Sequence, residues 1–436
     1  MTGESLAQKI IAMASGKEHV EPGELVWVKV NTLMIHDIAI AGVVEIFKKE
    51  FGDNAKIWDR NKVVLIPDHF AYTKDDMANN NIRIMREFAH HQGVEHFYDL
   101  STKMARGVCH IALPECGYTR PGEILVGTDS HTTMAGAFGT FAIGVGNTDA
   151  AYILGTGEIL LKVPQSIKVI FEGVLPSYLQ AKDLILKVIG DLTVGGGAYC
   201  SIEFSGPVIE NLSAEERMTI CNMAAECGAK SGIMVPNKAA INYVKNRTNI
   251  NFGVILPDTN AVYIKTLVYD VTEMEPVVAL PHSPDNLVSI SEVPDIKIDR
   301  VYLGSCTGGK FDDFMAVANI LKGKKVLVET YAVPATREII EKLINEKIDG
   351  ESIFGILSNA GVFISLEPCC AACFGGTDDT FGRANKAMNI LSTTNRNFLG
   401  RMGHKEAKIF LASPYTAAVS ALTGHITSPT TFMDKI

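Results

Sequence analysis

The segment with the most obvious chemistry is 366–376, which reads LEPCCAACFGG. Its Cys370-Ala-Ala-Cys373 pair can bind zinc, hold an iron–sulfur cluster or carry out dithiol redox chemistry. A further thiol, Cys306, lies far upstream in GSCTGGK. A structural zinc site needs four ligands, whereas three thiolates on a [4Fe–4S] cluster leave one iron free to act as a Lewis acid. Spacing alone leaves three interpretations open: a cluster, a zinc ion, or a core cysteine beside an inert pair.

The composition is that of a globular enzyme in a reducing compartment. The 436 residues are 47% hydrophobic and 20% charged, with a net charge of −9. The start, MTGESLAQKI, lacks an apolar h-region, and no apolar run reaches the roughly 18 residues of a membrane helix. We therefore expect a cytoplasmic protein with no membrane contact, whose nine cysteines are not disulfide partners. The acidic balance, without a Lys/Arg cluster, argues against nucleic-acid binding.

The hydrophobic pattern predicts an α/β fold with parallel sheets. Short β-rich runs alternate with helical periodicity, as in a strand over 61–70, a helix over 73–93 and a strand over 94–100. The regular alternation of strand-like and helical segments ends near Gln165, and a helix is predicted over 214–230 in the part that follows. The alternation resumes at Ile296. This pattern divides the chain into three predicted domains, 1–164, 165–293 and 294–436.

Residues capable of acid–base, thiol or carboxylate-binding chemistry follow the ends of predicted strands. In the third domain these are Cys306, Cys370, Cys373, Asn395, Arg396 and Arg401. In the first domain they are Asp68, His69, Asp129, Ser130 and His131. Ligands of open α/β sheets collect beyond the carboxyl ends of the strands, so we expect the thiols and arginines to meet at one rim.

A series of motifs extends the signal through almost the whole chain. In order they are IPDHF, GVCHIALPE, VGTDSHTTMAGAFGTFAIGVGNTD, TICNMAAECGA, GSCTGGK, PCCAACFGG and STTNRNFLGRMGH. Together they resemble the aconitase superfamily, and within it the branch of separate large subunits found in 3-isopropylmalate dehydratases and homoaconitases. The resemblance implies three α/β/α domains of the aconitase type around a [4Fe–4S] cluster, without the fourth, swivelling domain of single-chain relatives.

The matching motifs also imply which cysteines bind the cluster. Cys306, Cys370 and Cys373 would be its three protein ligands, with one iron left open. Cys369 stands where the family usually has glycine, so we expect it not to be a ligand. The remaining cysteines lie in apolar stretches and are expected to be structural: Cys109, Cys116, Cys200, Cys221 and Cys227.

By the same resemblance, carboxylate–histidine pairs surround the open iron. The implied pairs are Asp68 with His69, Asp129 with His110, and Glu226 with His131, and Asn222 lies one helical turn before Glu226. A histidine held by a carboxylate can protonate a leaving hydroxyl near neutral pH, and His69 is the expected donor. We interpret His36, His404 and His425 as ordinary loop or core residues.

The segment STTNRNFLGRMG resembles the substrate-carboxylate segment of the family. It nominates Asn395, Arg396 and Arg401, with Ser130 as a further substrate contact. Arginine suits this role because its planar fork bonds a carboxylate bidentately and stays charged at any working pH.

The implied activity is that of an iron–sulfur hydro-lyase large subunit. It would move a hydroxyl between adjacent carbons of a hydroxy di- or tricarboxylate through an unsaturated intermediate. A small subunit carrying the swivel domain and a catalytic serine is the implied partner, and a small hydroxy acid the substrate.

Two departures from the isopropylmalate pattern keep other substrates open. They are GGK at 308–310, where NGR is usual, and the loop MIHDIAIAG at 34–42. The alternatives are dehydration of 2,3-dimethylmalate or another methylmalate, and a homoaconitase large subunit. An iron-responsive RNA-binding protein and a zinc-dependent hydrolase are rivals from other classes.

Overall fold

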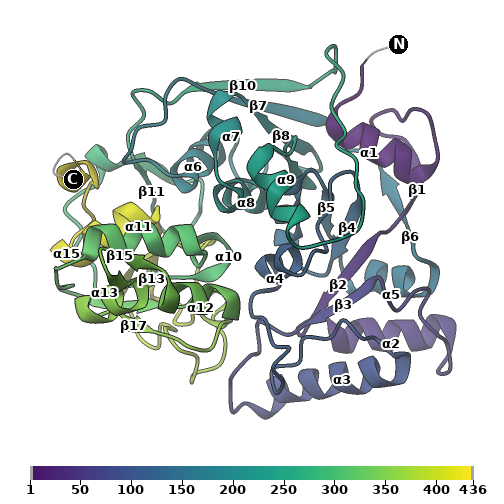
Figure 1. Cartoon of the computed structure of the whole chain (residues 1–436), viewed down its shortest axis with the longest axis horizontal. Coiled ribbons are helices and arrows are strands. Elements are labelled where there is room, and N and C mark those ends of the chain that lie inside the picture. The colour runs from purple at the N-terminus through teal and green to yellow at the C-terminus, as the bar shows by residue number, and fades with distance from the viewer. Residues whose placement is uncertain (1–2, 434–436) are drawn as a thin grey trace.

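The computed structural model describes residues 3–433. Three main sheets follow one another along the chain: the N-terminal one lies at the right of Figure 1, the middle one at the top and the C-terminal one at the left. Two of them have four strands, in the orders β3-β2-β4-β5 and β10-β7-β8-β9, and all their pairs are parallel. The third has seven strands, β12-β11-β19-β18-β13-β14-β17, and is parallel except where β11 pairs. The prediction of an α/β fold with parallel sheets is confirmed, and the domain boundaries stay a prediction.

The strands of the first sheet and its neighbouring ribbon are β1 (Leu25–Lys29), β2 (Thr32–His36), β3 (Val63–Ile66), β4 (Ile124–Gly127), β5 (Phe141–Gly144) and β6 (Glu158–Lys162). Those of the second sheet are β7 (Ser166–Glu172), β8 (Ser201–Ser205), β9 (Ser231–Ile233) and β10 (Lys265–Asp270). Those that follow are β11 (Val277–Ala279), β12 (Leu287–Ser289), β13 (Arg300–Leu303), β14 (Glu329–Ala332), β15 (Lys347–Ile348), β16 (Glu351–Ser352), β17 (Phe363–Ile364), β18 (Asn389–Ser392) and β19 (Lys408–Leu411).

The helices of the first half are α1 (Leu6–Ser15), α2 (Ile40–Phe51), α3 (Asp76–Gln92), α4 (Cys109–Glu115), η1 (Ser130–Phe138), α5 (Asn147–Thr156), α6 (Ala181–Leu192), α7 (Pro207–Asn211), α8 (Ala214–Met223) and η2 (Ala224–Cys227). Those of the second half are α9 (Lys238–Lys245), η3 (Ile290–Glu292), α10 (Ser305–Gly308), α11 (Phe311–Leu321), α12 (Arg337–Asn345), α13 (Ile353–Ala360), α14 (Ala371–Phe374), α15 (Pro414–Thr423) and α16 (Thr430–Met433).

The first sheet is buried on both faces, which explains its continuous apolar strands. Successive side chains of a strand point to opposite faces. Leu33 and Ile35 of β2 accordingly join the core formed with α1, α2, α3 and α5, whereas Met34 between them packs with Cys109 and Leu113 of α4. The helices on the two faces thus hold the strand ends rigidly.

The predicted site residues follow the carboxyl ends of neighbouring parallel strands. In the seven-stranded sheet, β18, β13, β14 and β17 are adjacent, and the segments after three of them carry Asn395, Cys306 and Cys370. In the first sheet β2 lies between β3 and β4, so the end of β2 at His36 falls between the segments that carry Asp68 and Asp129. Sheet order therefore brings distant parts of the chain to one place.

Two local predictions differ from the structure. The strand over 94–100 is wrong, because only an isolated bridge links Phe97 to Leu65 of β3. The helix over 214–230 ends earlier: the α-helix stops at Met223 and continues as a 3₁₀ turn to Cys227, where Gly228 adopts φ +77°. The helix over 73–93 is confirmed as α3, with Asp75 as its N-cap.

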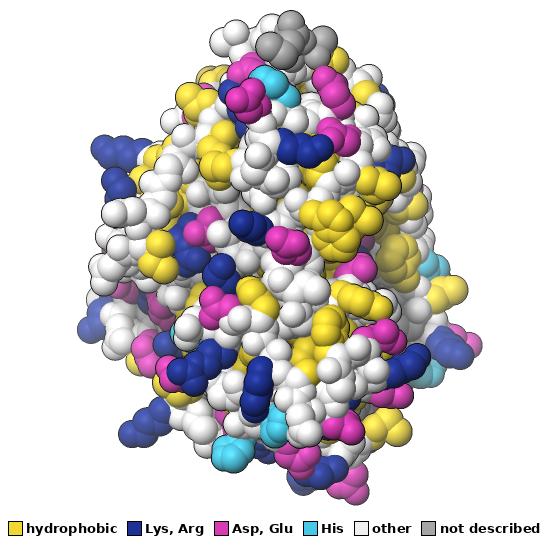
Figure 2. All heavy atoms as spheres, turned by 90° about the vertical axis from the view of Figure 1, so that its right-hand side faces the viewer, with side chains coloured by type: hydrophobic (Ala, Val, Ile, Leu, Met, Phe, Trp, Pro, Cys, Tyr) yellow, Lys and Arg dark blue, Asp and Glu magenta, His cyan; other side chains and the backbone are white. Residues whose placement is uncertain are grey.

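The molecular surface mixes charged and apolar side chains. On the face shown in Figure 2, basic and acidic side chains alternate, and hydrophobic ones lie between them. Leu25, Trp27 and Leu160 of the antiparallel β1–β6 ribbon are among the exposed hydrophobic residues. Within residues 3–433, none of the helices has the length and apolar character needed to cross a membrane.

Candidate active site

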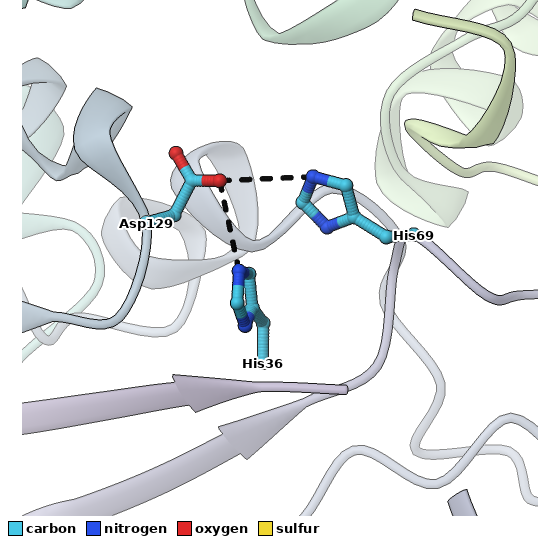
Figure 3. A group of neighbouring side chains, drawn as sticks. All are labelled: His36, His69 and Asp129. Carbon is cyan, nitrogen blue, oxygen red and sulfur yellow. Dashed lines mark ion pairs between the residues drawn. The ribbon is translucent and has the colours of Figure 1, made fainter. Parts of the chain in front are cut away.

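Asp129 lies at the centre of a group of buried histidines. Its Oδ2 is 3.7 Å from Nε2 of His36 and 3.6 Å from Nε2 of His69, and Figure 3 shows the carboxylate pointing between the two rings. Its Oδ1 is 3.0 Å from Nε2 of His110 and 3.3 Å from Nδ1 of His131. Burial would raise the pKa of Asp129, but His110 and His131 outweigh it and hold that pKa well below its ordinary value. Asp129 is therefore an anion shared by four imidazoles.

His69 is held as a proton donor by Asp68. Its Nδ1 lies 2.7 Å from Asp68 Oδ1, and both side chains are buried. Burial disfavours both charged forms, but the attraction between the two groups and their hydrogen bond outweigh it. The pKa of His69 rises to about 10 and that of Asp68 falls to about 2. At neutral pH His69 is a cation whose Nε2–H faces Asp129.

Asp37 fixes the backbone that carries this pair. Its Oδ1 accepts the backbone N–H groups of Asp68 and His69 at 3.2 Å each, and its Oδ2 accepts the N–H of Phe70. Asp37 is fully buried. One carboxylate thus satisfies three consecutive amides and locks the turn after β3, because charge-assisted hydrogen bonds are the strong ones.

A second chain of paired groups runs from His131 to the surface. His131 Nε2 donates to Glu226 Oε1 at 2.6 Å, and Arg396 Nε lies 2.9 and 3.0 Å from the two oxygens of Glu226. A terminal nitrogen of Arg396 donates to Ser130 Oγ at 3.0 Å. Burial and Arg396 lower the pKa of His131, yet its hydrogen bonds to Asp129 and Glu226 raise it to about 9. Arg396 is thus committed in part to Glu226, and only the rest of its guanidinium is open to an anion.

The three predicted ligand thiols come together beyond the carboxyl ends of the strands of the seven-stranded sheet. Cys306, Cys370 and Cys373 are all buried and free of disulfides. Asn395 bridges two of them: its Nδ2 is 3.3 Å from Cys306 Sγ, and its Oδ1 is 3.3 Å from Cys373 Sγ. The hydrogen bond with Cys370 lowers the pKa of Cys306 to about 5, and the corresponding bond lowers the pKa of Cys373 well below its ordinary value.

Polar groups around the thiols favour negative charge. Asn222 Nδ2 lies 3.1 Å from Cys306 Sγ, and its Oδ1 accepts from Asn395 at 3.3 Å. A terminal nitrogen of Arg401 is 3.9 Å from Cys373 Sγ. Among the described residues, the Nε of Arg401 is a buried donor without a partner, and Nδ1 of His110 is a buried ring nitrogen without one. Such orphaned groups call for a bound anion or a polar group of a ligand.

The donor set fits an iron–sulfur cluster. Three thiols of two distant segments share one buried place, two of them with a lowered pKa, and amide N–H groups point at a sulfur. Thiolate ligands with hydrogen bonds to sulfur are typical of such clusters. Cys370 hydrogen-bonds to both of the other thiols, which raises its own pKa, and metal binding would displace that proton. The neighbouring Cys369 is buried as well, but among the described residues it has no hydrogen bond to Cys306 or Cys373.

His36, predicted to be an ordinary loop or core residue, is buried as a core residue would be, but it lies beside the predicted site residues. Its ring packs edge-on against that of His69, with centroids 5.0 Å apart, and its Nε2 faces Asp129. The strand-end argument that selected Asp68 and Asp129 applies equally to His36 and Asp37, which follow the apolar run TLMI. The buried lysines Lys182 and Lys310, beside the Cys306 segment, carried no comparable signal.

Comparison with known proteins gives a consistent result over nearly the whole chain. The aconitase family (aconitate hydratase) matches residues 8–424. The 3-isopropylmalate dehydratase large subunit of Arabidopsis thaliana, a chloroplastic protein, is 51% identical over 99% of this chain and 87% of its own length. The large subunit 1 proteins of that name from Methanopyrus kandleri and Pyrococcus furiosus are 40% and 42% identical, over 99% and 98% of this chain and 100% and 99% of their own.

Proposed function

The chain belongs to the aconitase family, and on that premise we propose that it is the large subunit of a two-chain 3-isopropylmalate dehydratase. It is a hydro-lyase that moves a hydroxyl between adjacent carbons through an unsaturated intermediate. The identities of 40% to 51% to relatives carrying that name favour isopropylmalate over dimethylmalate and homocitrate-type acids. The relatives are named large subunits, which implies a small-subunit partner. Its swivel domain and serine base are part of the proposal, and a cytoplasmic location stays a prediction.

Cys306, Cys370 and Cys373 would hold a [4Fe–4S] cluster in this proposal. When bound, the cluster would supply a Lewis acid at an iron that carries no protein ligand. Asn222 and Asn395 would stabilise the sulfur of Cys306 through their N–H groups.

The protein's own residues supply the acid and the anion site. His69 carries the proton that the departing hydroxyl needs, because Asp68 keeps its imidazole charged at neutral pH. The orphaned Nε of Arg401, with the terminal nitrogens, offers a fork for a substrate carboxylate. A base of the partner subunit would remove the proton alpha to a carboxylate. The C–O bond would then break as His69 donates its proton to the hydroxyl oxygen, which leaves as water. Return of water to the neighbouring carbon completes the isomerisation.

The chain Arg396–Glu226–His131 would then hold the other side of the site. Because its hydrogen bonds to Asp129 and Glu226 keep His131 protonated, its positive charge would help to stabilise a substrate anion in the site. Ser130 is placed by its hydrogen bond from Arg396 and can contact the substrate directly.

The single observation that carries the proposal is the meeting of Asn395 with the sulfurs of Cys306 and Cys373 beside the histidine group. The test reconstitutes the chain with iron and sulfide under anaerobic conditions, with and without the small subunit. We expect cluster uptake by the chain alone, but turnover of 3-isopropylmalate only by the pair, and lower activity on 2,3-dimethylmalate and homocitrate. Failure to take up iron, or full turnover without the partner, would refute the proposal.

A further inference from the structure

Lys182, at the start of α6, is buried in an unusual position. Its side chain is about as inaccessible as the core leucines, with a relative exposure of 1%. A buried ammonium is costly unless it is well bonded, and the first turn of a helix disfavours positive charge. A residue kept there against both effects must make specific interactions.

The ammonium of Lys182 bonds to two loops at once. Its Nζ donates to the backbone oxygens of Thr394 at 2.6 Å and Thr393 at 3.2 Å, and lies 3.4 Å from Oγ1 of Thr307. All three donors of the ammonium are thus accounted for. Burial and the nearby Lys310 lower the pKa of Lys182 to about 7. Within the described part of the chain no carboxylate pairs with Lys182, and its N–H groups are directed to neutral oxygens of these loops.

Both loops lead directly into the site. Thr307 follows Cys306, and Thr394 precedes Asn395, whose Nδ2 bonds Cys306 Sγ. Thr307 Oγ1 also donates to the Thr393 backbone oxygen at 2.9 Å, which joins the loops next to the lysine. Lys182 Nζ is therefore a shared support of the thiol segment and the amide segment, beside the direct bond from Gly304 N–H to Thr393 Oγ1.

Lys310 has a different environment and does not duplicate this role. Its Nζ donates to the backbone oxygen of Thr307 at 2.8 Å and to Asp313 at 2.6 Å. Both partners lie within three positions of Lys310, so these bonds brace the Cys306 turn internally. They do not reach the loop of Thr393 and Thr394.

We propose that Lys182 is a positioning residue that holds the Cys306 loop against the loop of Thr393 to Asn395, so that the thiol and the amide face each other. Its consequence for catalysis rests on the proposed function, but the bridge itself is a property of the metal-free chain. Loss of the ammonium should therefore free Cys306 before it affects the rest of the core.

The test measures alkylation of individual cysteines by mass spectrometry in the metal-free, reduced chain. Lys182→Met is compared with Lys187→Met, a change on the same helix at a partly exposed residue paired with Asp191. Cys221, a fully buried cysteine of α8, is the internal reference for general loosening. We expect Lys182→Met to raise the rate at Cys306 about tenfold relative to Cys221, as loss of the hydrogen bonds that Lys182 makes to the two loops implies, and Lys187→Met to leave the ratio unchanged. An equal rise at both cysteines, or no rise, would overturn the proposal.

A second variant covers the case in which Lys182→Met does not fold. Thr307→Val removes one acceptor of the ammonium and one bond between the loops, at almost unchanged volume. We expect a smaller rise at Cys306, again relative to Cys221. In the reconstituted protein either variant should also alter the electron paramagnetic resonance signal of the reduced cluster, whereas Lys187→Met should not. Because alkylation is read without metal, a chain that binds no iron would refute the proposed function and leave this result intact.

Discussion

His131 Nε2 lies 2.6 Å from Glu226 Oε1, although 95 positions separate the two residues in the chain. Glu226 comes from the 3₁₀ turn after α8, and His131 from the segment after β4. Arg396 binds both oxygens of Glu226, and Asp129 contacts Nδ1 of His131, so positive and negative groups alternate across the site. This alternation keeps charged groups stable in a buried place, where an unpaired charge would be costly.

The Asp68–His69 pair predicts a pH-dependent activity. Replacing Asp68 by Asn removes the attraction that raises the pKa of His69 to about 10, so burial should then lower it. We expect the alkaline limb of the kcat/KM profile of the two-chain enzyme to move to lower pH, with activity reduced about tenfold or more at pH 7. Asp75→Asn, at the N-cap of α3 where Asn caps equally well, is the matched control.

The same pair predicts a change in stability with pH. His69 has a higher pKa in the folded chain than the value near 6.5 of an unfolded one, and Asp68 a lower pKa than the value near 4 of an unfolded one, so the pair stabilises the fold fully between about pH 4 and about pH 6.5. That contribution is lost as the pH rises toward about 10. Urea unfolding of the metal-free chain from pH 6 to pH 10 should show a steeper decline for the wild type than for Asp68→Asn. Parallel curves would contradict the assignment.

The cysteines can be distinguished by iron content. Cys370→Ser should abolish stable cluster binding, because it removes one of the three thiols gathered at the sheet edge. Cys369→Ser changes the adjacent residue, which has no hydrogen bond to Cys306 or Cys373 among the described residues, and should retain the iron of the wild type. Iron and sulfide per chain after anaerobic reconstitution, with the visible absorbance, provide the comparison. Equal iron loss in both variants would show that iron binding depends on the integrity of the segment around Cys369 and Cys370, and not on the Cys370 thiol itself.

Arg401 is expected to act on substrate and not on the cluster. Arg401→Lys keeps the positive charge but loses the bidentate fork, which should lower kcat/KM about tenfold or more, mainly through KM. Iron content should stay at the wild-type value. An unchanged KM together with lost iron would instead assign Arg401 to the support of Cys373, from which it lies 3.9 Å.

Asp37 is expected to be needed for both stability and activity. Asp37→Ala leaves the buried N–H groups of Asp68, His69 and Phe70 without their acceptor, which should lower the free energy of unfolding by about 2–4 kcal/mol. Chemical denaturation measures this loss, and Asp53→Ala at an exposed position serves as the control. A change of less than about 0.5 kcal/mol, the usual size of a surface effect, would contradict the role of Asp37 as an anchor.

Much of the architecture could be predicted from the sequence because it depends on local patterns. Apolar runs of strand length alternating with helical periodicity predicted parallel sheets, and strand-end positions predicted where Asp68, Asp129 and Cys306 would lie. Motif order alone indicated the aconitase family. The weak strand signal over 94–100 failed because the pairing of a strand depends on a partner that the local sequence does not contain.

The tertiary structure alone decided which charged groups meet. The sequence by itself determined the chemical types and the strand ends, but not that His36 faces Asp129, nor that Asp37 binds three amides. It could not place Lys182, since a lysine at the start of an amphipathic helix looks like any solvent-exposed one. Burial and pKa values arise from groups far apart in the chain, and the order of strands in the sheets fixes which of them become neighbours.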